Sequence, residues 1–313
     1  MVQVKGSSSV PGGVIAGLGF GVAAGVALGA LVLAPSMDGE PTAGGNNDNS
    51  DYEKAVQDKE IARAQANSSD SVVREFSSET VRDTLSDRPV LVISTPDAAD
   101  GDIRGLQSLL HSAGAQKAGH LKLTQDFFTQ DKADELKSIV ANTLPAGAEL
   151  SEDKISPGTH AGQALGAAML MNPDDAQPLA SVDDRAQLLQ ALRKAGFIDY
   201  EDGTMRPAQA VLLVTGSEKE GYATETLGTF AEAIDEVGNN TVVAGRVEQA
   251  APDGVIGSLR GADSHISTVD SVDRSFARMA AVLAVAEQLD GDDGAYGSAA
   301  SAEAAAPVKP ESN

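Results

Sequence analysis

The sequence contains no cysteine and no tryptophan, and aromatic residues make up only 4% of it. Without cysteine the chain cannot form a disulfide or a thiolate metal site, an absence that suits both an exported domain and a reducing compartment. The scarcity of aromatic rings argues against a sugar-stacking platform or an aromatic cage for a ligand. Basic residues are also few, since 23 Lys and Arg stand against 46 Asp and Glu, a formal net charge of −23. Such a chain repels phosphate, so we expect no nucleic-acid partner.

Motifs of the common catalytic and metal sites are missing as well. No G-x-S-x-G nucleophile motif occurs, and the four histidines show no H-x-x-x-H spacing. Met169 and Met171 end an apolar helical pattern, and we interpret them as core residues rather than copper ligands. The sequence therefore predicts no catalytic residue, no metal ligand and no cofactor, and we expect a protein that is not an enzyme.

An uncharged segment near the N-terminus predicts a membrane anchor. Its apolar core, Val14–Leu33, has 20 residues, which at about 1.5 Å each cross a hydrocarbon layer of about 30 Å. We predict a short cytoplasmic arm at 1–13 and a transmembrane helix at 14–34, and a cleaved secretory signal is the alternative. Lys5 precedes the span and acidic residues follow it, an arrangement that places the main domain outside the plasma membrane.

Glycines inside this segment predict that the span pairs with a second copy. Glycines spaced four apart lie on one face of a helix and leave a groove that a second helix can approach closely. In water each would be less favourable than alanine by about 1 kcal/mol, whereas a bilayer enforces the helix. The predicted dimer face consists of Gly17, Gly21, Gly25 and Gly29. We therefore expect a homodimer held together in the lipid bilayer.

A flexible linker at 35–50 and a helical stalk at 51–86 are expected to follow the span. The stalk segment has neither proline nor glycine and is rich in helix-forming residues. Long aliphatic residues are nearly missing from its heptad positions, so a weak coiled coil and a solvated single helix remain open alternatives. Side chains that could contact a partner along the stalk are Tyr52, Val56, Val73 and Phe76.

From 87 to 290 short apolar runs alternate with helical stretches. The expected strands are 89–95, 120–123, 210–216, 241–244 and 266–269, and the expected helices are 101–114, 132–142, 160–171, 182–195, 224–237 and 274–289. This alternation is typical of an α/β fold, here a Rossmann-like parallel sheet covered by helices and forming an extracytoplasmic domain. The Ala- and Gly-rich residues 291–313 predict a disordered tail.

The loop after the first expected strand is the first place to look for a site, because parallel sheets bind ligands at the carboxyl ends of their strands. It contains Asp97, Asp100 and Asp102 but no G-x-G-x-x-G and no Walker glycine loop. We interpret the three acids as caps of the following helix. Asp97 and Asp100 could alternatively hold a divalent cation, although no further acid cluster completes such a site.

Several long motifs resemble a known family. They include VRDTLSDRPVLVISTPDAADGDI at 81–103, GTHAGQALGAAMLMN at 158–172 and ARMAAVLAVAEQLDGDDGAYGSA at 277–299. Over nearly its whole length the chain resembles the actinobacterial MctB/SteB family of envelope proteins. The resemblance brings no catalytic or metal-binding residue with it.

The resemblance implies two alternative functions. One is a scaffold that dimerises and, with a cytoplasmic SteA-like partner, activates an extracytoplasmic NlpC/P60 peptidoglycan endopeptidase during cell separation. The other is a copper transport or copper tolerance factor of the envelope. A single span cannot line an aqueous pore by itself. We therefore expect the scaffold and activator role, with the copper role as the alternative.

Overall fold

The computed structural model describes residues 48–219, 221–262 and 264–307, with side chains described from Glu53 onward. The predicted span, its four glycines and the side chain of Tyr52 lie outside these described residues. Within them, no helix combines the length and the apolar character needed to cross a membrane. The chain divides into two compact units, 1–69 and 70–313, which we describe separately.

Helix α2, Asp48–Thr80, supplies all the described residues of the first unit and the beginning of the second. Its side chains from Glu53 to Ser69 are exposed, Val56 and Ile61 among them. Further along, Val73 is half-buried and Phe76 is 63% exposed. A helix therefore occupies much of the predicted stalk, and its pairing with a second copy stays a prediction.

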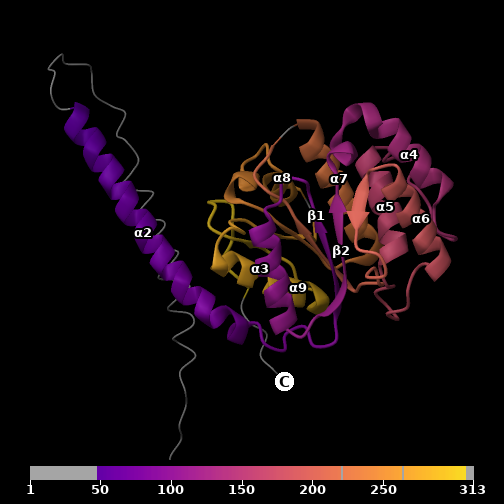
Figure 1. Cartoon of the computed structure of the whole chain (residues 1–313), viewed down its shortest axis with the longest axis horizontal. Coiled ribbons are helices and arrows are strands. Elements are labelled where there is room, and N and C mark those ends of the chain that lie inside the picture. The colour runs from indigo at the N-terminus through magenta and orange to yellow at the C-terminus, as the bar shows by residue number, and fades with distance from the viewer. Residues whose placement is uncertain (1–47, 220, 263, 308–313) are drawn as a thin grey trace, which may run out of the picture. The chain divides into compact units, whose positions relative to one another are not determined.

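The second unit contains one seven-stranded sheet in the order β3-β2-β1-β4-β5-β6-β7. Figure 1 labels its strands β1 and β2. The strands are β1 Pro89–Ser94, β2 Gln116–Leu123, β3 Ile198–Tyr200, β4 Ala210–Val214, β5 Thr241–Ala244, β6 Ser267–Val269 and β7 Ala295–Tyr296. All neighbouring strands are parallel except β3, which runs antiparallel to β2 at one edge. The predicted α/β class with a mainly parallel sheet is confirmed.

Helices cover both faces of the sheet, and each face has its own hydrophobic core. One face carries α3 Asp100–Ser112 and α9 Ser275–Asp290. The other carries α4 Ala133–Asn142, α5 Pro157–Met169, α6 Val182–Lys194, α7 Gly221–Gly238 and α8 Val255–Gly261. The short 3₁₀ turns are η1 Gln125–Phe128, η2 Gln130–Lys132 and η3 Val247–Ala250.

The apolar run of β1 reflects burial on both faces of the sheet. Leu91 and Ile93 enter the core beneath α5 and α7, whereas Val90 and Val92 enter the core beneath α3 and α9. All four side chains are at most 3% exposed. Because each fully buried aliphatic side chain contributes about 1.5–3 kcal/mol, a polar replacement of any of these four residues would destabilise the fold.

Glycines also bring α5 and α7 into close contact within the second unit. Gly158, Gly162 and Gly166 are spaced four apart on α5 and face α7. A Cβ atom at Gly162 would lie 2.6 Å from the carbonyl oxygen of Phe230 and 2.8 Å from Cβ of Ala233. The pattern that predicts helix pairing in a bilayer therefore serves here to pack two helices of an α/β fold.

Within residues 291–307, part of the tail predicted to be disordered, Ala295–Tyr296 form strand β7, which pairs with β6 at the sheet edge. This segment is held by hydrogen bonds to a buried ion pair between Arg260 and Asp270, whose charged atoms lie 3.1 Å apart. Arg260 donates to the carbonyl of Tyr296, and Asp270 accepts from the backbone N–H of Ser298. Two residues distant in sequence thus fix a segment that has little apolar surface of its own.

Candidate functional site

The carboxyl ends of the neighbouring parallel strands β1 and β4 meet where the order of the strands in the sheet reverses. From β1 the chain continues through α3 to β2 on one side, and from β4 it continues through α7 to β5 on the other. Since α3 and α7 cover opposite faces, the loops after β1 and β4 separate here. This switch point is where open α/β sheets bind their ligands.

A small pocket of about 40 Å³ lies at this switch point. Its lining includes the polar residues Thr95, Asp97, Gln125, Thr215, Glu218, Thr224 and Gln249 and the apolar residues Pro96, Phe128, Ala223, Leu227 and Val255. These residues come from the loops after β1, β4 and β5, from η1 and from the starts of α7 and α8. No single stretch of sequence contains the site, and topology alone assembles it.

Asp97 is one of the two acidic residues that line the pocket. Its Oδ1 accepts from the hydroxyl of Thr95 at 2.5 Å, and its Oδ2 accepts from the backbone N–H of Glu218 at 2.9 Å. Oγ1 of Thr95 also lies 3.3 Å from Oγ1 of Thr215. Thr95 has one hydroxyl hydrogen, and the shorter contact directs it to the carboxylate. Thr215 can then donate to Thr95, and the lone pairs of the Thr215 hydroxyl remain available to accept from a ligand.

Close backbone packing holds these loops together. A Cβ atom at Gly216 would lie 2.7 Å from the carbonyl carbon of Asp97, so the loops after β1 and β4 touch directly. Gln249, which is 1% exposed, donates to the carbonyl of Glu218 at 2.6 Å and accepts from the N–H of Val255 at 3.1 Å. The pocket is therefore built from loops that are already hydrogen-bonded to one another.

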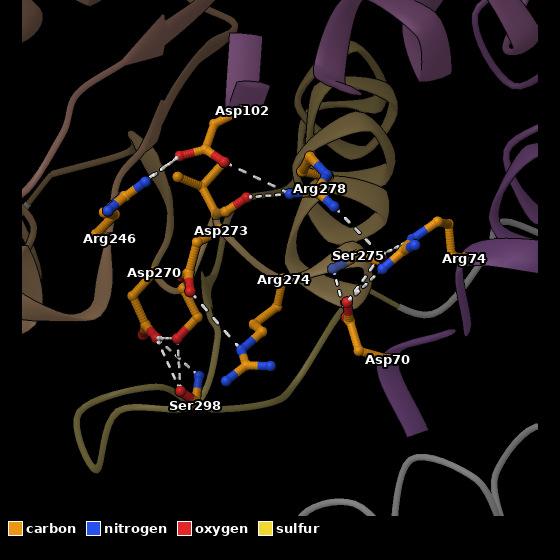
Figure 2. Close-up of polar contacts among 12 residues, drawn as sticks. Asp70, Arg74, Asp102, Arg246, Asp270, Asp273, Arg274, Ser275, Arg278 and Ser298 are labelled. Atoms are coloured by element: carbon orange, nitrogen blue, oxygen red, sulfur yellow. Dashed lines mark hydrogen bonds and ion pairs between the residues drawn. The ribbon is translucent and has the colours of Figure 1, made fainter. Parts of the chain in front are cut away.

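Asp100 and Asp102 lie in the first turn of α3, as the capping interpretation requires, but none of the three acids supplies a side-chain cap. Helix α3 begins after Ala99, with no side-chain hydrogen bond at that position. Asp102 is instead buried and accepts from Arg246 at 3.2 Å, with a second arginine, Arg278, at 3.6 Å (Figure 2). Asp100 is exposed and lies 4.0 Å from Arg104. The acids therefore serve separate purposes, and Asp97 alone belongs to the pocket.

A capping contact of a different kind occurs at the start of α9. The carboxylate of Asp70 accepts from the backbone N–H of Ser275 at 2.5 Å and from its hydroxyl at 3.0 Å. Arg74 donates to the same hydroxyl at 3.2 Å (Figure 2). Because the residue before α9, Arg274, supplies no cap of its own, Asp70 satisfies the first turn of α9 from a distant part of the chain.

The structure brings none of the predicted partner-contact residues to this pocket. Val56, Val73 and Phe76 lie on α2, and the four glycines of the predicted dimer face are outside the described residues. The interpretation of Met169 as a core residue is confirmed, since it is buried within the core of α5. Over the described ranges, no group of three or more His, Cys, Asp or Glu is arranged to hold a metal ion.

Sequence reasoning missed most of the pocket. One usable signal was present, because Thr95 and Thr215 occupy the same place, directly after the two continuous apolar runs. Hydroxyl residues that end two adjacent parallel strands face the same edge of the sheet. Gln125 and Gln249 carried no such signal, since they reach the pocket only through the path of the loops.

Comparison with known proteins identifies the family. A family described as "Copper transport outer membrane protein, MctB" matches residues 14–307. This chain belongs to the MctB family. The copper transporter MctB of Mycobacterium tuberculosis is 33% identical over 254 residues, 78% of this chain and 81% of that protein. The copper transporter MctB of Mycobacterium leprae is 34% identical over 229 residues, 69% of this chain and 72% of that protein.

These findings confirm the resemblance and correct the function expected from it. The expected role as activator of a peptidoglycan hydrolase is contradicted, because the MctB family and both relatives carry names of copper transport. The physical objection to copper transport was that a single span has no lumen. That objection concerns one isolated copy, so it could not decide between the two functions implied by the resemblance.

Proposed function

We propose that this protein acts in copper transport or copper tolerance at the cell envelope, as a single-pass membrane protein without enzymatic activity. The observation that supports this most strongly is the MctB family match, which spans residues 14–307. Relatives named copper transporters align over more than two thirds of both chains. The match begins at residue 14, where the predicted apolar core also begins, so the predicted anchor belongs to the region common to the family.

Copper is the cargo in this proposal and not a resident cofactor. The formal net charge of −23 draws cations of any kind toward the protein and raises their local concentration. Such attraction is not selective for copper, so the proposal assigns no copper ligand among the described side chains. Pairing of the span through its glycines is part of the proposal, because transport by single-span proteins requires more than one copy or a further protein.

Gene deletion with measurement of cell-associated metal tests the proposal. In the organism that encodes this chain, we expect the deletion strain to retain more copper and to stop growing at a lower copper concentration than the parent strain. Zinc content, measured in the same samples by mass spectrometry, should stay unchanged. The full chain should restore the parental copper content, and a variant lacking 14–34 should not. Equal copper content and equal growth in the parent and deletion strains would overturn the proposal.

A further inference from the structure

We propose that the pocket at the carboxyl ends of β1 and β4 binds a primary alkylammonium group, as found at the end of a lysine side chain or of a free aliphatic diamine. This inference is independent of the copper proposal, since copper does not enter it. Three properties of the pocket carry the inference: a fixed carboxylate, an excess of hydrogen-bond acceptors, and an apolar wall beside a small volume.

The carboxylate of Asp97 is held in place before any ligand arrives. The hydroxyl of Thr95 and the N–H of Glu218 donate to its two oxygens at 2.5 and 2.9 Å. The remaining lone pairs of the carboxylate stay available to a third donor. A ligand that supplies N–H donors and positive charge therefore meets an acceptor that needs no reorganisation.

The pocket offers acceptors and negative charge but no cation. None of its lining residues is Lys, Arg or His. Glu218 is exposed, and its carboxylate has no hydrogen bond or ion pair among the described residues. Lys219, the next residue, instead pairs with Asp253 at 2.6 Å and holds the pKa of that carboxyl below its usual range. Two acidic residues, Asp97 and Glu218, thus line the pocket without a basic residue in its lining.

Helix α7 opposes this preference only weakly. Ala223 and Thr224, in its first turn, line the pocket, and a helix N-terminus carries roughly half a positive charge. The carboxylates of Asp97 and Glu218 together carry two formal negative charges. The net negative charge around the pocket therefore favours a cation over the phosphate that many switch-point sites bind.

Volume and the apolar wall define the shape of the ligand. A water molecule needs roughly 10–15 Å³ of such space, so about 40 Å³ accommodates an ammonium head and a short stem but no sugar or nucleotide. Phe128, Leu227 and Val255 form the apolar part of the pocket lining, here called the wall. Methylene groups can pack on this wall while the charged head reaches the carboxylates.

Calorimetric titration of the full chain in detergent tests the proposal. The probe is n-butylammonium chloride, and the matched compounds are n-butanol, sodium butyrate and sodium phosphate. We expect n-butylammonium to bind with a Kd of roughly millimolar size, as suits a ligand of so few atoms, and to bind at least about tenfold more tightly than the other three. Added salt should weaken its binding because the mouth of the pocket is exposed.

Variants of the two carboxylates locate the binding. Asp97→Asn and Glu218→Gln should each raise the Kd for n-butylammonium about three- to tenfold, as for a partly exposed charge pair. Glu225→Gln, at an exposed acid of α7 outside the pocket, should leave it unchanged. Circular dichroism of each variant verifies the fold. If Asp97→Asn unfolds, Glu218→Gln alone decides, because its side chain makes no contact that the fold needs.

Two further ligands separate the possible sources of the ammonium group. Stronger binding of 1,5-diaminopentane indicates a free diamine, and stronger binding of N-acetyl-lysine methylamide indicates a lysine side chain. Several results would overturn the proposal: no binding of n-butylammonium, equal binding of n-butanol or phosphate, or an equal loss of affinity in Glu225→Gln.

Discussion

The contact between α5 and α7 makes Gly162→Ala the most demanding test of the packing described above. In an ordinary helix this change would stabilise by up to about 1 kcal/mol, since alanine is the better helix former. Here the new Cβ would lie 2.6 Å from the carbonyl oxygen of Phe230 and 2.8 Å from Cβ of Ala233. Carbon atoms prefer separations of about 3.5–4.0 Å, so the two helices must move apart by about 1 Å.

Moving the helices apart also loosens the contacts of Gly158 and Gly166 on the same face of α5. Overpacking of this kind destabilises by about 1–3 kcal/mol, which outweighs the gain in helix propensity. We therefore expect a net loss of up to about 2 kcal/mol in the free energy of unfolding. Urea unfolding of the full chain in detergent, followed by far-UV circular dichroism, measures this loss as a lower midpoint at unchanged slope.

Gly228 of α7 supplies the matched control. It lies inside the partner helix, and its nearest neighbour for an added Cβ is Cγ2 of Val255 at 3.9 Å, an ordinary contact. Gly228→Ala should therefore stabilise by a few tenths to about 1 kcal/mol. If Gly162→Ala proved as stable as Gly228→Ala, the close approach of α5 and α7 would be refuted.

Three further predictions concern other contacts. Asp70→Ala should lower the free energy of unfolding by about 1 kcal/mol, measured by urea titration, because the first turn of α9 at Ser275 loses its cap. Burial, and secondarily Lys122, holds the pKa of His120 below its ordinary value of 6.5. The folded state therefore binds fewer protons than the unfolded state just below pH 6.5, and stability should fall as the pH decreases from there through the lowered pKa. His120→Gln should remove this pH dependence, and an unchanged profile would contradict the assignment. Replacing Gly21 and Gly25 together by isoleucine should abolish cross-linked dimers in membranes, and an unchanged dimer yield would refute the predicted pairing face.

The strands buried on both faces could be predicted from the sequence because they are continuous apolar runs. The expected strand at 89–95 corresponds to β1, and that at 210–216 corresponds to β4. The edge strands β3 and β7 could not be predicted in this way, since they are three and two residues long. Such short strands depend on a partner strand and not on a local pattern.

Polar residues were harder to interpret than apolar ones because their partners are far away in sequence. Asp102 lies in the first helical turn and has the composition of a cap, yet its partner Arg246 is 144 residues away. The pocket shows the same limit, since Asp97 receives a hydrogen bond from Glu218 across 121 residues. Local propensity favours a local partner for each carboxylate, and only the order of the strands reveals the distant ones.

The short strand β7 has a practical consequence for the boundary of the α/β unit. A chain cut at 290 would leave the backbone groups of β6 without their neighbour and so expose an open sheet edge to other chains. The ion pair between Arg260 and Asp270 would remain. Arg260 would lose its hydrogen bond to the carbonyl of Tyr296, and Asp270 would lose the one it accepts from the N–H of Ser298. Chains that stop at 290 should therefore aggregate, whereas chains that retain residue 307 should remain monodisperse.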